Sequence, residues 1–136
     1  MTYRLNPYLT FNGNAREAME FYRSVLGGDL SIMTFGEVGT PDPGLQDKVM
    51  HAQLTAAGGN TLMGADCPPG MDFQPGNTMT VCLSGDTGDG LHELWQKLAE
   101  GATVTVPLEK QMWGDEFGQM VDRYGVQWMV NIGQPQ

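Results

Sequence analysis

Two stretches of the chain, residues 14–28 and 89–101, have the apolar spacing of an amphipathic helix. Apolar side chains that recur three or four positions apart lie on one side of a helix, where they can pack against a core. They are Ala18, Phe21, Tyr22 and Val25 in the first stretch and Leu91, Leu94, Trp95 and Leu98 in the second. We therefore expect one helix in each stretch.

Residues that favour helix ends accompany both stretches. Asn14 is a residue type that caps a first turn, and Glu17 follows three positions later, as in a capping box. Gly27 and Gly28 follow the first helix and Gly101 follows the second, which is where glycine commonly ends a helix. These residues predict where each helix begins and ends.

Eight further segments have the composition or the alternation of apolar and polar residues that favours β-strands. Four precede residue 67, and they are 7–11, 30–37, 48–56 and 60–66. Four follow the segment 67–76, which is rich in Pro and Gly, and they are 77–85, 102–109, 116–122 and 126–132. Each half of the chain therefore reads as strand, helix and three strands.

The two halves also match residue by residue. Apolar residues fall on apolar residues, and turn glycines fall on glycines. The matched pairs include Leu9 with Cys82 and Tyr22 with Trp95, each 73 positions apart, and Gly59 with Gly125 and Met63 with Met129, each 66 positions apart. We therefore interpret the sequence as an internal repeat.

The predicted fold class is α+β, with two tandem βαβββ modules in a single domain over residues 1–136. The first module covers about 1–66, a linker covers 67–76, and the second module covers about 77–136. Two such modules packed side by side would form a curved, cup-like mixed sheet with the helices outside.

Composition excludes some classes of function. With 136 residues, of which 40% are hydrophobic, the chain can form one globular core. No apolar run is long enough to span a bilayer, and the first residues lack the apolar region of a signal peptide, so we expect a cytoplasmic protein that does not enter a membrane. The net charge of −9, with seven Lys and Arg, argues against nucleic acid as a partner. Cys67 and Cys82 are expected to be free thiols.

Three segments of the chain carry a resemblance to a known family. They read PYLTFNGNAREAMEFYRSVLGG, VMHAQLTAAGGNTLMGAD and WGDEFGQMVDRYGVQWMVNI. The chain resembles, over essentially its whole length, the PhnB-like branch of the vicinal oxygen chelate superfamily, which includes glyoxalase, bleomycin-resistance and extradiol dioxygenase proteins. The resemblance implies paired βαβββ modules and a homodimer. The branch has also been labelled a demethylubiquinone methyltransferase, but the sequence contains no glycine-rich loop suited to a methyl-donor nucleotide.

The resemblance also implies where a metal would be held. Metal-dependent relatives use His and Glu at four inward-facing strand positions, two in each module, and these fall on Pro7, Met63, Thr80 and Met129. None of the four is a plausible ligand for a hard or borderline divalent ion, because thioethers suit soft ions such as Cu(I). We therefore expect no metal site of the family type and no cofactor.

His51 is the best candidate for a catalytic residue. Strand alternation places His51 and Gln53 on one face of residues 48–56 and Ala52 and Leu54 on the other, toward a helix. An imidazole in that position could act as a general base or bind a ligand, and it could equally be a structural histidine. His92 lies off the apolar stripe of the second helix and is expected at the surface.

Side chains predicted to face the cup could form the wall of a ligand site. This apolar set contains Leu9, Phe35, Met63, Cys82 and Met129, and the same side chains could instead fill the cup. Trp113 lies in a turn, where it could cap a pocket or enter a dimer interface. Trp128 alternates with Met129 along its strand, so we expect it to face the helices and be a core residue. The predicted ligand-binding residues are Phe35, His51, Gln53, Met63, Trp113 and Met129.

These observations favour a protein that binds a small organic molecule in the sheet cavity without the family metal site. One alternative is an enzyme of the lyase, isomerase or dioxygenase type, either metal-dependent or metal-free with His51 as the base. A second alternative is a structural dimer whose cup is filled by its own side chains. The sequence does not identify the ligand.

Overall fold

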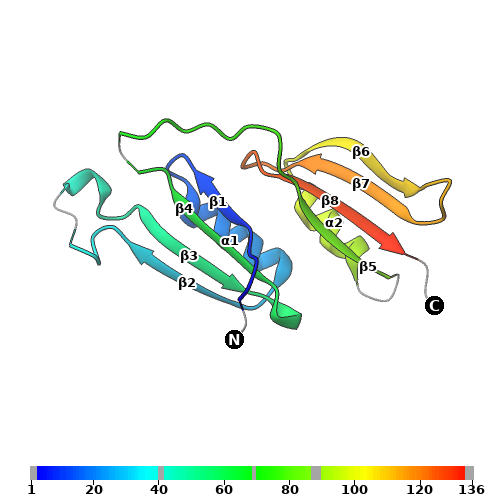
Figure 1. The fold of residues 1–136 in the computed structure, drawn as a ribbon, viewed down its shortest axis with the longest axis horizontal. Coiled ribbons are helices and arrows are strands. Elements are labelled where there is room, and N and C mark those ends of the chain that lie inside the picture. The colour runs from blue at the N-terminus through cyan, green and yellow to red at the C-terminus, as the bar shows by residue number, and fades with distance from the viewer. Residues whose placement is uncertain (1–2, 40–41, 69, 87–89, 134–136) are drawn as a thin grey trace. The chain divides into compact units, whose positions relative to one another are not determined.

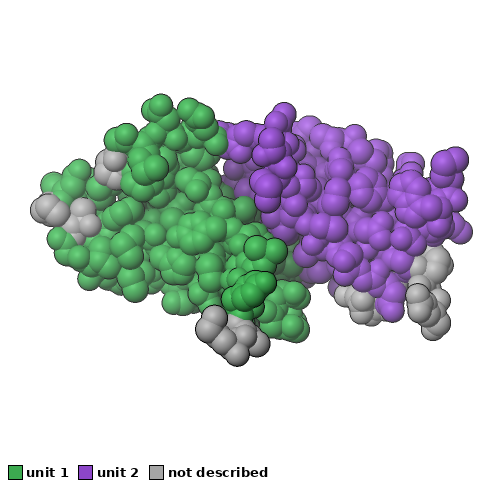
Figure 2. Space-filling model, in the orientation of Figure 1, with its two compact units in different colours: residues 1–74 green, residues 75–136 purple. Residues whose placement is uncertain are grey.

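The computed structural model describes residues 3–39, 42–68, 70–86 and 90–133. The chain divides into two compact units, residues 1–74 and 75–136 (Figure 2). Each unit contains one α-helix and one four-stranded mixed sheet, in the order βαβββ (Figure 1). The predicted α+β class and the tandem modules are confirmed. The cup that the two modules were expected to form together stays a prediction.

The first module contains one helix, four strands and two short 3-10 turns. They are β1 (Tyr8–Phe11), α1 (Ala15–Leu26), β2 (Asp29–Thr34), η1 (Pro43–Leu45), β3 (Val49–Thr55), η2 (Ala57–Gly59) and β4 (Thr61–Asp66). The sheet order is β1-β4-β3-β2. β1 runs parallel to β4, and the other neighbours are antiparallel. The η2 turn joins β3 to its antiparallel neighbour β4.

α1 covers one face of this sheet (Figure 1). Its buried residues are Ala15, Ala18, Met19, Tyr22 and Val25, so three of the four predicted apolar positions are buried and Phe21 is half-buried. The sheet contributes Ala52 and Leu54, both completely buried, to the same core. No helix formed by the described residues of this module covers the opposite face of the sheet, and we refer to this face as the open face of the first sheet.

The N-terminus of α1 differs from the prediction. Asn14 occupies the N-cap position, but its side chain makes no capping hydrogen bond. Instead, Oδ1 of the buried Asp66, at the end of β4, accepts a hydrogen bond of 2.9 Å from the backbone N–H of Ala15. A carboxylate next to a helix N-terminus is stabilised by the helix dipole, so a residue from β4 replaces the expected local cap. The expected end of the helix is confirmed, because Gly27 has a φ of 73° and its N–H donates to Arg23 O.

The second module repeats this arrangement. It contains β5 (Val81–Asp86), α2 (Leu91–Ala99), β6 (Thr103–Lys110), β7 (Glu116–Val121) and β8 (Gln127–Gly133). The sheet order is β5-β8-β7-β6, with β5 parallel to β8. Leu91 of α2 packs with Val130 and Ile132 of β8. Trp128 is 1% exposed, which confirms it as a core residue. Residue 89, the predicted start of the helix, lies outside the described residues.

The register of β1 and β5 corrects the predicted repeat by one residue. Tyr8 pairs with Met63, and Cys82 pairs with Met129. Because Met63 and Met129 are 66 positions apart, Tyr8 and Cys82 are equivalent, at an offset of 74 instead of 73. Leu9 pairs with Gly64. A Cβ added at Gly64 would lie 3.1 Å from Sδ of Met19, so this position points toward α1. Leu9 therefore faces the helix, and its predicted place in the cup wall is wrong.

Strand β2 is also shorter than predicted. It ends at Thr34, and Phe35 begins a turn in which its N–H donates to Lys48 O at 3.0 Å. No helix among the described residues is long and apolar enough to cross a membrane.

Candidate functional site

A row of side chains crosses the open face of the first sheet. Residues that pair in register on neighbouring strands point to the same face. The register joins Tyr8 to Met63, Met63 to Gln53 and Gln53 to Ser31, so these four residues form one row across β1, β4, β3 and β2. Leu54 and Leu62, which alternate with Gln53 and Met63, are buried on the helix side.

His51 lies in the next row and is hydrogen-bonded to Tyr8. On β3 it is two residues from Gln53, so it shares the open face, and its partner on β2 is Met33. The hydroxyl of Tyr8 lies 3.0 Å from Nδ1 of His51, and the two ring centroids are 5.6 Å apart with planes tilted by 32°. Sequence reasoning did not select Tyr8 because the offset of 73 placed Pro7, one residue earlier, at this position.

The Tyr8 hydroxyl is neutral near pH 7, because the ordinary pKa of a phenol is about 10. Burial raises the pKa of the Tyr8 phenol above its ordinary value. The phenol can donate to Nδ1 of His51, which places the imidazole hydrogen on Nε2, or accept from Nδ1–H, which leaves a lone pair on Nε2. Within the described residues, neither Nε2 of His51 nor the side-chain amide of Gln53 has a hydrogen-bond partner. Both groups are available to bind another molecule.

The structure brings three predicted site residues together and separates a fourth. His51, Gln53 and Met63 share the open face of the first sheet. Phe35 was predicted to lie on a strand and face the cup, but it lies in the turn after β2 and is half-buried. β2 ends at Thr34, directly after a register shift between Met33 and Thr34 in its pairing with β3. Ligand binding by these residues stays a prediction.

The second sheet has an equivalent row on the face opposite α2. Cys82 pairs with Met129, Met129 with Gln119, and Gln119 with Val106. Gln119 and Met129 therefore repeat Gln53 and Met63 at the same offset of 66. The offset that relates the two glutamines was already visible in the sequence, but Gln119 was not selected. Burial raises the pKa of the Cys82 thiol, which favours its neutral form.

The repeat does not extend to the histidine. Phe117 occupies the position of His51 at the offset of 66, and it pairs with Asn131 of β8. The amide of Asn131 donates to Asp115 at 3.1 Å. Trp113, in the turn before β7, is 61% exposed and has an edge contact with Phe117 at 6.3 Å between ring centroids. Its two predicted roles, capping a pocket or entering a dimer interface, stay predictions.

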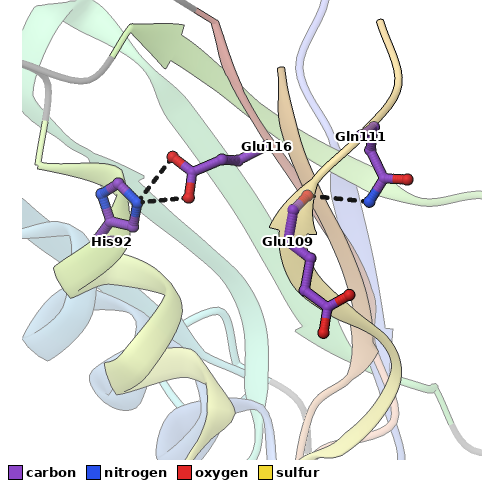
Figure 3. A network of polar contacts seen from close by, with 4 residues as sticks. All are labelled: His92, Glu109, Gln111 and Glu116. Carbon is purple, nitrogen blue, oxygen red and sulfur yellow. Dashed lines mark hydrogen bonds and ion pairs between the residues drawn. The ribbon is translucent and has the colours of Figure 1, made fainter. Parts of the chain in front are cut away.

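His92 is a surface residue, as predicted, and its side chain is hydrogen-bonded to Glu116. Nε2 of His92 lies 3.0 and 3.1 Å from the two carboxylate oxygens of Glu116 (Figure 3). The side chain of His92 is 49% exposed. Gln111, drawn in the same view, donates to the backbone carbonyl of Glu109 at 2.9 Å. The contact with Glu116 tethers α2 to β7, so this histidine has a structural role.

The positions that a family-type metal would use carry neither His nor a carboxylate. The register replaces the expected Pro7 and Thr80 by Tyr8 and Cys82, which stand beside Met63 and Met129. Each module then offers one thioether with a phenol or a thiol, and thioethers suit soft ions such as Cu(I). Among the described residues, no group of three or more His, Cys, Asp and Glu side chains could hold a metal ion.

Comparison with known proteins identifies similar sequences and structures. The pattern of a family described as 3-demethylubiquinone-9 3-methyltransferase matches residues 3–131. Protein PA1353 from Pseudomonas aeruginosa is 38% identical, and its crystal structure has a TM-score of 0.89 over 98% of this chain and 100% of that one. A PhnB protein from Bacillus cereus, described as a putative 3-demethylubiquinone-9 3-methyltransferase, is 27% identical, with a TM-score of 0.74 over 96% of this chain and 100% of that one. A glyoxylase/bleomycin resistance protein/dioxygenase domain from Frankia sp. EAN1pec shares the fold at 16% identity, with a TM-score of 0.67 over 98% of this chain and 93% of that one.

Proposed function

Because this chain belongs to the PhnB-like family and has the fold of the glyoxalase/bleomycin resistance/dioxygenase proteins, we propose that it binds a small organic molecule on the open face of the first sheet. The binding uses polar anchors from the protein and no metal at the family positions. The protein acts as a homodimer in the cytoplasm under this proposal.

The observation that carries the proposal is the hydrogen bond between Tyr8 and His51 on that face. It fixes the orientation of the imidazole and leaves Nε2 available for a ligand. Gln53 adds an amide without a described partner, and Met63 adds an apolar surface between Tyr8 and Gln53. A few convergent polar groups on an apolar wall are the usual composition of a small-molecule site.

The name of the matching family refers to methyl transfer, and the local structure gives that activity no support. A glycine-rich loop of the G-x-G-x-x-G type contacts a nucleotide between a strand and a helix. In the first module, β1 ends at Phe11 and α1 begins at Ala15, and the residues between them are Asn-Gly-Asn. Because the family name refers to methyl transfer, the ligand panel should include the methyl donor S-adenosylmethionine. We expect it not to bind, because the nucleotide-binding loop is missing at this place.

A second candidate function is metal-free acid–base catalysis, and the same hydrogen bond favours it. A general base must be oriented by a third group and must have a free lone pair within reach of its substrate. Nδ1–H of His51 could donate to the Tyr8 oxygen, and the lone pair of Nε2 would then accept a proton. Ligand anchoring by Nε2–H and base catalysis by Nε2 thus require opposite tautomers of neutral His51, and nitrogen-15 NMR of the imidazole distinguishes them.

The test is a thermal-shift panel of small organic molecules on three proteins: wild type, His51→Gln and His92→Gln. We expect at least one compound to stabilise wild type and His92→Gln and to lose this effect in His51→Gln. A ligand at 100 times its Kd adds about 2.7 kcal/mol to the free energy of unfolding, which a melting curve detects readily. Equal stabilisation of His51→Gln would contradict the site.

Elemental analysis tests the metal-free part of the proposal. The purified protein should contain no stoichiometric divalent metal, and ligand binding should survive treatment with a chelator. A stoichiometric metal whose removal abolishes binding would refute this part and would favour the metal-dependent alternative.

A further inference from the structure

Phe117 lies on the face of the second sheet that is opposite α2. Both of its neighbours on β7 face the helix. Glu116 is hydrogen-bonded to His92 of α2 (Figure 3), and a Cβ added at Gly118 would lie 2.8 Å from the ring of Trp95. Because successive side chains of a strand point to opposite faces, the ring of Phe117 points away from α2.

The turn between β6 and β7 holds a second aromatic ring against Phe117. In this turn the N–H of Gln111 donates to Asp115 O at 2.8 Å, and the N–H of Gly114 donates to Gln111 O at 3.0 Å. The ring centroids of Trp113 and Phe117 lie 6.3 Å apart, with their planes at 63°. Trp113 is exposed, so much of its indole surface remains in contact with solvent. We refer to these two rings as the aromatic corner.

A carboxylate is held beside the aromatic corner. Asn131 pairs with Phe117 and lies between two core residues of β8, Val130 and Ile132, so its side chain also points away from α2. Its amide donates to Oδ2 of Asp115 at 3.1 Å. The carboxylate of Asp115 therefore lies on the same face as the ring of Phe117, in an orientation that the amide fixes.

Strand β6 contributes a second carboxylate to this face. Glu109 pairs with Phe117, and residues that pair on neighbouring strands point to the same face. The preceding residue, Leu108, packs against the core beneath α2, which agrees with an outward direction for Glu109. Glu109 is exposed. Carboxylates from β6 and from the turn before β7 therefore lie on either side of one aromatic ring.

The charge of the second module favours a cation at this place. Residues 75–136 contain eight Asp and Glu and three Lys and Arg, so their formal charge is −5 with His neutral. Lys97 lies on α2, and Lys110 pairs with Glu116, which points to α2. Arg123, in the turn between β7 and β8, donates to the backbone carbonyl of Glu100. A negative field of this kind attracts cationic ligands.

We propose that the aromatic corner binds an organic cation with a substituted ammonium group. The charge lies between the carboxylates of Asp115 and Glu109, and the alkyl groups lie against the rings of Trp113 and Phe117. An aromatic face attracts a cation that lies within about 6 Å of the ring centroid. A small metal ion would use the two carboxylates and gain nothing from an apolar ring surface, so the rings select an organic cation. All four residues belong to the second module, and the site goes beyond the proposed function, which uses the first sheet.

The test compares choline with 3,3-dimethylbutan-1-ol, which has nearly the same shape and no charge. Each compound is titrated into the nitrogen-15-labelled full chain, and NMR follows the indole N–H of Trp113, identified by its loss in Trp113→Phe. We expect choline to shift this resonance to saturation and the neutral alcohol to bind at least about tenfold more weakly. Added sodium chloride should weaken choline binding because it screens the carboxylates.

Three variants remove one negative charge each without changing side-chain size. Asp115→Asn and Glu109→Gln should each weaken choline binding about threefold to tenfold. Glu93→Gln, at an exposed position on α2, is the control and should change it less than about twofold. Asp115→Asn keeps an oxygen that can accept from Asn131, and a melting curve checks that each variant is folded.

Trp113→Leu tests the aromatic part of the site. It keeps an apolar side chain and removes the ring, so choline binding, followed at the backbone N–H of Phe117, should weaken at least about threefold.

Each contrary result overturns the inference at a separate point. Equal binding of the neutral alcohol would show that the corner recognises shape without charge. Magnesium chloride that binds more tightly than choline and displaces it would make the two carboxylates a metal site. Equal effects of Glu93→Gln and Asp115→Asn would show attraction by net charge alone, and a Trp113 resonance that choline does not shift would show that no such site exists. None of these results bears on ligand binding by the first sheet.

Discussion

Trp128 donates its indole N–H to the carboxylate of Asp122 at 2.8 Å, and both residues are almost completely buried. The second oxygen of the same carboxylate accepts from the N–H groups of Tyr124 and Val126, at 2.8 and 3.0 Å. One side chain therefore shapes the turn between β7 and β8 and also accepts the hydrogen bond from the indole nitrogen of a core tryptophan. Turn geometry and core packing of the second module are coupled at this residue.

Asp122→Asn should destabilise the protein by about 1–3 kcal/mol, because an amide nitrogen in place of Oδ2 cannot accept from the buried indole. Urea denaturation measures this loss. In a Trp128→Phe background the indole donor is absent, so the same substitution should lose much of its effect. Equal losses in the two backgrounds would contradict the coupling.

Asp66→Asn should destabilise the first module for a related reason. The carboxylate accepts 2.9 Å bonds from Ala15 N and Val49 N, which join the start of α1 to the start of β3. The amide keeps one acceptor and loses the charge that favours a helix N-terminus, so we expect a loss of about 1–3 kcal/mol. Asp29→Asn, at an exposed site on β2, is the control and should change stability by less than about 0.5 kcal/mol. A similar loss in both variants would argue against the bridging role.

Gly118→Ala should be poorly tolerated. A Cβ at this position would lie 2.8 Å from Cη2 of Trp95 and 2.9 Å from the backbone Cα of Leu108, and backbone cannot move aside cheaply. Overpacking of this kind costs about 1–3 kcal/mol. Gly133→Ala is the control in the same sheet, because its nearest contacts would be an ordinary 3.7 Å. Melting curves of the two variants should differ clearly, and equal stability would show that α2 can shift away from β7.

His51→Ala should leave the fold nearly intact. The imidazole is half-buried on the open face, and its bond to Tyr8 is exposed to solvent, so we expect a change within about 1 kcal/mol. Leu54→Ala, on the helix side of the same strand, removes a completely buried side chain and should cost about 2–5 kcal/mol. Thermal denaturation that ranks the two variants equally would make His51 a structural histidine.

Cys82 should form its thiolate at higher pH in the folded protein than in the unfolded chain. Burial raises the pKa of this thiol, so the folded state retains the proton after the unfolded chain has released it. The thiol therefore contributes to stability below the unfolded pKa, and this contribution is lost as the pH rises toward the folded pKa. Iodoacetamide labelling in a Cys67→Ser background, followed against pH with and without urea, measures both midpoints. Coincident midpoints would contradict the prediction.

Several parts of this fold could be predicted because they depend on local pattern. The apolar stripe in 14–28 and the glycines after it are local properties of one helix, and the structure places α1 and its end there. The alternation around Met129 likewise predicts that Trp128 points to the core. A period of 3.6 or 2 residues is set by backbone geometry, so it can be recognised without any knowledge of the partners.

The first strand was harder to interpret because its own pattern is ambiguous. β1 reads Tyr-Leu-Thr-Phe, with apolar residues on both faces, and either face could be assigned to the helix. A shift of one residue turns every side chain of a strand to the opposite face. The offset of 73 therefore put Leu9 in the cup wall and missed Tyr8, and only the pairing with β4 corrected it.

The sequence by itself determined the order of helices and strands and the tandem repeat, because these follow from residue type and local period. Tertiary structure decided which distant residues meet. Asp66 reaches Ala15 from 51 positions away, and Tyr8 reaches His51 from 43 positions away. Both contacts form because β4 lies between β1 and β3 in the sheet, and strand pairing depends on the energy of the whole core instead of the pattern of any one segment.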